Sequence, residues 1–128
     1  MTVVRLIAIL AALTGATAIA GPAFAQARPA PAGETLFKQR CANCHTTTAG
    51  QRHGLGPNLV GVMGRKPAAA ANYNYSQGMR TATAAWTPQT LEPFLAAPTR
   101  AVPGTRMTMG VANPADRSAI IAYLQTVR

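Results

Sequence analysis

The sequence predicts a small all-α domain. Three segments place apolar residues at helical spacing, and two of them begin with Thr-Pro or Asn-Pro, a common helix start. No run of alternating or β-branched residues indicates a strand, and no internal repeat is present. Glycine, proline and asparagine are frequent between the first and second of these segments. We therefore expect three main helices joined by long loops.

The first expected helix spans residues 34–45. Within it Phe37, Cys41 and Cys44 recur every three or four residues, so they share one face of the helix. Leu36 and Arg40 fit the same periodicity. The apolar stripe thus carries both cysteines of the chain.

The second expected helix begins after Thr87, where a threonine cap precedes proline. Its inner face consists of Leu91, Phe94 and Leu95, which follow helical spacing. Proline cannot continue a helix without losing a hydrogen bond, so we expect this helix to stop at Pro98.

The third expected helix begins after Asn113 and runs to the C-terminus. Asp116 falls in its first turn, where a carboxylate complements the helix dipole. One further short helix is expected over residues 77–81, within the loops. The inner face of the third helix comprises Ile120, Ile121, Leu124 and Val127.

Residues 41–45 read Cys-Ala-Asn-Cys-His, and this motif carries the chemistry of the chain. On a helix, Cys41, Cys44 and His45 project into one narrow arc. Two thiols in that arc can add across the two vinyl groups of a haem, while the imidazole beside them binds the iron. The motif therefore predicts one covalently attached haem c, with His45 as an axial ligand.

Two other readings of the motif are zinc and dithiol chemistry. The only other histidine, His53, lies eight residues beyond His45, which does not match the spacing of a zinc finger. A thioredoxin-like pair would follow a strand, and none is indicated before Cys41. The haem interpretation fits the context best.

The N-terminus has the pattern of a secretory signal. A basic residue, Arg5, precedes an apolar stretch that ends in Ala-Phe-Ala, so residues 1–25 predict a cleavable signal peptide. An uncleaved membrane anchor is the alternative, although the apolar run is short for a span and contains glycine. Two prolines among alanines predict that residues 26–32 form a flexible lead-in to a domain over 33–128.

Export and charge restrict the partners. Without Arg5 the chain keeps eleven of its twelve Lys and Arg against three acids, a formal charge of +8. The basic residues are scattered, and an exported protein is not expected to bind nucleic acid.

The large aromatic side chains are few, so a buried porphyrin is expected to complete a thin core.

Beyond the haem motif, five stretches resemble class I c-type cytochromes, in particular mitochondrial cytochrome c and the bacterial cytochromes c2. The resemblance implies the small cytochrome c fold, with about three main helices and long loops wrapped around one covalently attached haem. It covers residues 33–128. The matching stretches are 33–37, 56–59, 61–66, 102–107 and 120–124, together with Tyr75 and Trp86.

The resemblance also implies the remaining site residues. The family's second iron ligand matches Met107. The carbonyl of Pro57 matches the group that accepts the remaining ring N–H of His45 when its other ring nitrogen binds the iron. Met109 matches a position that packs against the haem edge. Arg65, Tyr75 and Trp86 match positions that bind the haem propionates, although a surface arginine and ordinary core aromatics are the alternative.

Two residues depart from the pattern on the methionine side. Phe94 replaces a tyrosine whose hydroxyl contacts the axial sulfur in many relatives, and Met79 replaces a polar residue near it. The hydrogen-bond network at that sulfur is therefore in question.

The resulting prediction is a soluble, monomeric, periplasmic electron carrier rather than an enzyme. Its expected partners are acidic docking surfaces on a cytochrome bc1-type complex, an oxidase, a photosynthetic reaction centre or a periplasmic dehydrogenase. By resemblance, Arg40, Arg52, Arg100 and Arg106 ring the exposed haem edge. Two alternatives stay open: a peroxidase or gas-binding protein, if Met107 left the iron open, and an electron-transfer subunit dedicated to one dehydrogenase.

Overall fold

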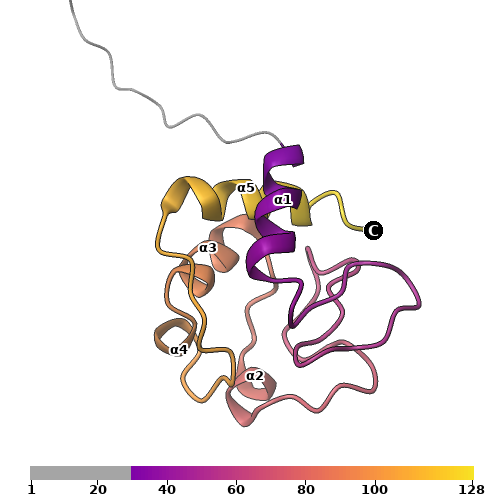
Figure 1. Cartoon of the computed structure of the whole chain (residues 1–128). Coiled ribbons are helices and arrows are strands. Elements are labelled where there is room, and N and C mark those ends of the chain that lie inside the picture. Colours follow the sequence, from indigo (N-terminus) through magenta and orange to yellow (C-terminus); the bar gives the residue numbers. More distant parts are fainter. Residues whose placement is uncertain (1–29) are drawn as a thin grey trace, which may run out of the picture.

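The computed structural model describes residues 30–128, and within this part of the chain five helices and no strand are present (Figure 1). The all-α prediction is confirmed, and the short helix expected over residues 77–81 is present as α2. None of the helices in residues 30–128 is long and apolar enough to cross a membrane. The helices are α1 (Ala30–Arg40), α2 (Gln77–Thr81), α3 (Pro88–Ala96), α4 (Pro98–Ala101) and α5 (Pro114–Leu124).

Both ends of α1 differ from the prediction. The helix begins at Ala30, so the predicted flexible lead-in is wrong for residues 30–32. Proline is tolerated in a first turn because no backbone donor is needed there, and the proline at 31 therefore does not delay the start. Residues 1–29, with the predicted signal peptide and the rest of the lead-in, lie outside the described part.

At its other end α1 stops at Arg40, before the cysteines. The N–H groups of Cys41 and Ala42 both donate to the carbonyl of Phe37, at 2.8 and 3.0 Å, as happens where a helix ends. The prediction of a helix through residue 45 is therefore wrong, and residues 41–44 form turns.

The start of α3 is confirmed in detail. The Thr87 hydroxyl accepts the Thr90 N–H at 3.3 Å, and the Thr90 hydroxyl accepts the Thr87 N–H at 2.9 Å. This reciprocal capping satisfies two donors that the first turn leaves without partners. The helix ends at Ala96, and Pro98 then begins α4, which was not predicted. A proline that ends one helix is favourable at the first position of the next.

Helix α5 begins as predicted, with the Asn113 side chain accepting the Ala115 N–H at 2.9 Å. It ends at Leu124, short of the C-terminus. Arg117 on this helix is buried: its guanidinium contacts Glu92 of α3 at 2.7 Å and donates to the carbonyls of Val111 and Ala112. This arginine joins α3, the preceding loop and α5.

The core forms where α1 and α5 cross, with α3 beside them (Figure 1). Phe37 of α1 stacks on Tyr123 of α5 with ring centroids 5.4 Å apart, and Trp86 meets Phe94 at 4.9 Å. Ile120 is fully buried. The loops between α1 and α2 cover the other side of the molecule (Figure 1).

Replacing Gly33 with alanine is expected to destabilise the fold by about 3 kcal/mol, the upper end for overpacked cores. A Cβ at Gly33 would lie 2.0 Å from the carbonyl oxygen of Ala119, so α1 and α5 would have to separate. Urea unfolding of the haem-bearing protein measures the change. Lys38→Gln, on the exposed face of the same helix, is the control and is expected to change stability by less than about 0.5 kcal/mol, since it removes only an exposed ion pair with Glu34. Equal stabilities for the two variants would contradict the argument.

Candidate haem site

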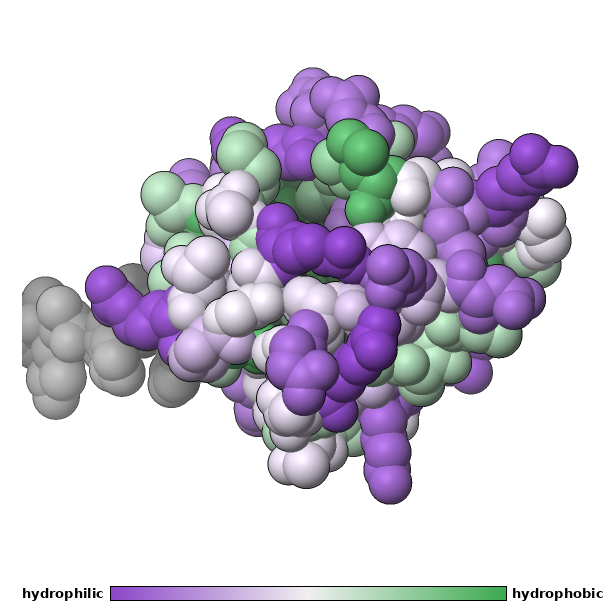
Figure 2. Space-filling model, turned by 90° about the horizontal axis from the view of Figure 1, so that it is seen from below, coloured by the Kyte–Doolittle hydropathy of each residue, from purple (hydrophilic) through white to green (hydrophobic). Residues whose placement is uncertain are grey.

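A cavity of ≈ 560 Å³ opens between the α1–α5 core and the loops. The face seen from below is hollowed, and hydrophobic side chains border the hollow next to hydrophilic ones (Figure 2). All the residues that the sequence predicted for the site line this one cavity. They are Cys41, Cys44, His45, Pro57, Arg65, Tyr75, Trp86 and Met107.

The turns after α1 bring the motif residues together even though the helix has ended. The N–H groups of Cys44 and His45 both donate to the carbonyl of Cys41, at 3.0 and 2.9 Å. These helix-like bonds preserve the spacing on which the prediction rested. Burial raises the pKa of the Cys41 thiol to about 11, and nearby Arg40 opposes the rise. The thiol is therefore protonated at neutral pH.

The orientation of His45 is fixed by the protein. Its Nδ1–H donates to the carbonyl of Pro57 at 2.8 Å, the contact that the resemblance implied. Burial lowers the pKa of His45 and the Pro57 bond partly offsets this, so the neutral ring is favoured. A neutral imidazole with Nδ1 occupied by its proton has its lone pair at Nε2, which suits it to bind a metal.

Gly56 lets the backbone pass against the face of the His45 ring. A Cβ at this position would lie 2.3 Å from the ring Cε1 of His45. Sequence analysis gave Gly56 no role beyond its place in a matching stretch. The Gly-Pro pair after the motif was the available signal, but the close approach depends on how the loop folds back.

Asn58 is a second residue whose role was missed. It is buried, its Nδ2 donates to the carbonyls of Thr48 and Gln51, and its Oδ1 accepts the Val60 N–H. These bonds fasten the loop after His45 to the segment that supplies Pro57. An Asn after Pro is a common turn residue, so its sequence context alone did not distinguish it.

His53 is fully engaged with the protein. Its Nδ1 accepts the Asn58 N–H at 2.9 Å, and its Nε2 bonds the carbonyl of Ala71 at 2.8 Å. Since a carbonyl only accepts, the proton lies on Nε2 and no lone pair is left for a metal. This arrangement argues against the zinc alternative and against His53 as a distal catalytic base.

Three methionines also line the cavity, namely Met79, Met107 and Met109. Met107 is half-buried against the core, and its N–H donates to the Thr105 hydroxyl at 3.3 Å. Met79, on α2, also packs against the core, whereas Met109 is 74% exposed. Phe94 lies in the cavity wall with no polar atom, so no hydroxyl reaches the sulfur from this residue.

The polar wall of the cavity is built from Arg65, Tyr75 and Trp86. The Arg65 guanidinium donates to the carbonyls of Val60 and Asn58, at 2.9 and 3.1 Å, which fixes it to the loop. The Tyr75 oxygen accepts the Ala70 N–H at 3.3 Å, so its own proton remains available to donate. Burial raises the pKa of Tyr75, which keeps this proton in place. Donors of this kind suit a carboxylate.

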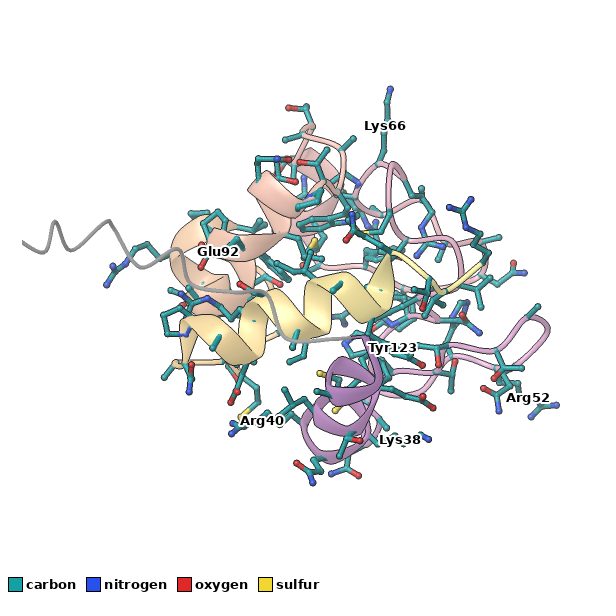
Figure 3. All side chains as sticks on the ribbon, turned by 90° about the horizontal axis from the view of Figure 1, so that it is seen from above. Lys38, Arg40, Arg52, Lys66, Glu92 and Tyr123 are labelled. Atoms are coloured by element: carbon teal, nitrogen blue, oxygen red, sulfur yellow. The ribbon has the colours of Figure 1, made fainter. Side chains whose placement is uncertain are left out.

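The ring of arginines implied by resemblance is only partly present. Arg40 and Arg106 line the cavity, and Lys66 does so as well, whereas Arg52 and Arg100 do not. Figure 3 shows Arg52 on a loop at the edge of the molecule. Arg40 also lies 3.6 Å from Asp116 of α5. The basic charge at the cavity therefore comes from Arg40, Arg65, Lys66 and Arg106 rather than from the four arginines expected.

These side chains fit a covalently attached haem. Two thiols lie beside an imidazole whose Nε2 is available, a thioether lines the same cavity, and the glycine at 56 leaves the face of that imidazole free of a side chain. Hydrogen-bond donors for carboxylates lie at the polar wall. Fold and site together define a small all-helical haem protein of the c type.

Comparison with known proteins identifies the family. The family model for cytochrome c matches residues 30–128. Proteins named cytochrome c from Gossypium barbadense and Ulva intestinalis are 42% and 43% identical over 105 residues, covering 80% of this chain and 95% of each of theirs. The cytochrome c of Kluyveromyces lactis is 41% identical over 93 residues, which cover 72% of this chain and 84% of that one. The chain belongs to the cytochrome c family, whose members carry electrons on covalent haem c and are not enzymes.

Proposed function

We propose that this chain holds haem c through thioethers at Cys41 and Cys44, with His45 and Met107 as the two iron ligands. The observation that carries the proposal is that all eight predicted residues line one cavity, with the His45 ring fixed by Pro57. The haem supplies an iron that gains and loses one electron. If His45 and Met107 both bound the iron, no position would be left open for a substrate.

The protein's own residues prepare the site for electron transfer. The Pro57 carbonyl fixes the tautomer of His45, while Arg65, Tyr75 and Trp86, which line the same cavity, would donate hydrogen bonds to the haem propionates. A thioether opposite an imidazole favours ferrous iron and raises the reduction potential. The cavity wall includes the buried apolar side chains Phe37, Leu91 and Phe94, which would shield much of a bound haem from water.

The test is an absorption spectrum of the oxidised and the reduced protein. A weak long-wavelength band from methionine sulfur to ferric iron, together with no response to carbon monoxide, is the expected result. A missing band with ready carbon monoxide binding would contradict closed His45/Met107 ligation and would favour the gas-binding or peroxidase alternative.

We further propose that residues 1–25 direct export and are removed, so that the mature protein is a monomer in the periplasm and is not inserted in a membrane. The sequence pattern of the N-terminus supports this. A bc1-type complex as donor, and an oxidase, reaction centre or dehydrogenase as acceptor, would fit an exported basic carrier. The intact mass of the secreted protein measures the cleavage.

Electron transfer to a partner with an acidic docking surface is expected to slow with added salt. We expect a fall of about tenfold between about 0.01 and 0.15 M salt, because the screening length shortens from about 30 to about 8 Å. Stopped-flow mixing with such a partner measures it, and an uncharged small reductant is the control.

Two variants refine this expectation. Lys66→Gln removes a charge at the cavity, and Arg52→Gln removes one away from it. Lys66→Gln is expected to slow association more than Arg52→Gln. If both variants associated with the partner at the same rate, or if the rate did not depend on salt, the basic residues would form a generic charged surface rather than a docking site at the cavity.

A further inference from the structure

The segment that carries Met107 is attached to the segment of α2 at two points. The two segments are distant in sequence, yet in Figure 1 α2 lies beside the chain that follows α4. Both segments line the cavity, the first through Met79 and the second through Met107. The contacts between them therefore lie next to the proposed iron ligand.

The first attachment is a hydrogen bond between Arg106 and Asn74. The Arg106 guanidinium donates to the backbone carbonyl of Asn74, across 32 residues of sequence. The side chain of the same asparagine accepts a hydrogen bond from Arg80 at 2.7 Å. Asn74 thus receives two guanidinium groups, one from α2 and one from the residue directly before Met107.

The second attachment is a close backbone contact at Gly78 of α2. A Cβ there would lie 2.1 Å from the carbonyl oxygen of Pro103 and 3.0 Å from the backbone N of Thr105. The backbone of α2 therefore contacts the backbone of the turn before Met107 directly, with no side chain between them. Gly104 in this turn has φ +79°, a conformation that glycine adopts readily.

We propose that Arg106 is a positioning residue, whose bond to Asn74 closes the Met107 segment onto α2 and so holds the thioether at the iron. The inference rests on the proposed ligation by Met107. We call this bond, together with the backbone contact at Gly78, the Arg106 latch. Opening requires only that the exposed Arg106–Asn74 bond break and the turn lift from Gly78.

Imidazole binding to the oxidised protein tests the latch. A neutral external ligand takes the iron only when Met107 leaves, so its apparent affinity reports the fraction of open molecules. At about pH 8, where imidazole is uncharged, Arg106→Ala is expected to bind it about tenfold more tightly than the parent protein. The long-wavelength band should weaken at correspondingly lower imidazole concentrations.

Three further variants separate the positioning role of Arg106 from its charge and from a general loosening of the segment. Arg100→Ala removes an equal charge from α4, outside the cavity lining, and is expected to match the parent. Arg106→Lys keeps an N–H donor and is expected to restore most of the parent's resistance to imidazole. Gly78→Ala, which lifts the turn directly, should exceed the effect of Arg106→Ala.

The outcomes distinguish the latch from the ligation on which it rests. A band in the parent, with equal imidazole affinities for Arg106→Ala and Arg100→Ala, would overturn the latch alone. Absence of the band in the parent would overturn the latch and the proposed Met107 ligation together. Tighter imidazole binding in Arg106→Ala and Gly78→Ala, but not in Arg100→Ala or Arg106→Lys, would establish Arg106 as a positioning residue.

Discussion

The variant with both Cys41 and Cys44 replaced by alanine, freed of haem, is expected to be largely unfolded. The cavity of ≈ 560 Å³ is bordered by core side chains that include Phe37, Phe94 and Ile120. By the measured dependence of stability on residual cavity volume, leaving this space empty costs on the order of 10 kcal/mol. Typical domains have a total stability of about 5–15 kcal/mol, so the cost matches the whole margin.

The measurement is thermal unfolding followed by circular dichroism, after any loosely held haem has been extracted. The single variants Cys41→Ala and Cys44→Ala each keep one thioether and serve as controls, because a tethered haem still fills the cavity. We expect a cooperative transition in both controls and none in the double variant. A native-like cooperative transition in the haem-free double variant would show that the polypeptide core suffices.

The parts of the fold that could be predicted are those fixed by neighbouring residues. The starts of α3 and α5 follow from Thr87 and Asn113, whose side chains bond N–H groups two or three residues ahead. Such bonds need no tertiary partner, so sequence suffices to place them. The end of α1 was missed because helix-like turns bring Cys41, Cys44 and His45 together as well as a helix would.

Contacts between distant loops could not be predicted in this way. The bonds from His53 to Ala71 and from Arg106 to Asn74 join residues 18 and 32 positions apart, and each depends on how the whole domain packs. The close approach of Gly78 to the turn at Pro103 is of the same kind. No local pattern marks either partner, so these contacts required the structure.

The site was predicted on two different grounds. Cys41, Cys44 and His45 came from the chemistry of their spacing, whereas Met107 came from resemblance, since a methionine is otherwise an ordinary core residue. The structure places Met107 in the cavity, but Met79 and Met109 line it too. The identity of the second ligand is therefore the part of the site that most needs a direct experiment.

Met107→Ala is expected to remove the long-wavelength band and to let the reduced protein bind carbon monoxide. The reduction potential should fall by roughly a few tenths of a volt, within the range over which axial ligands set haem potentials. Thr105 cannot replace the thioether, because its hydroxyl already accepts the N–H of residue 107 and is a poor ligand for ferrous iron. The expected change is thus a loss of ligation rather than a substitution by a neighbour.

Met109→Ala is the matched control, since it removes the same kind of side chain two residues further along. That side chain is 74% exposed, so its loss is expected to leave the band and the potential close to those of the parent. Met79→Leu tests the third methionine in the cavity with its volume conserved, and it too should keep the band. If Met109→Ala or Met79→Leu abolished the band while Met107→Ala kept it, Met107 would not be the ligand. The proposed role of Arg106 would then be overturned as well, because it rests on ligation by Met107.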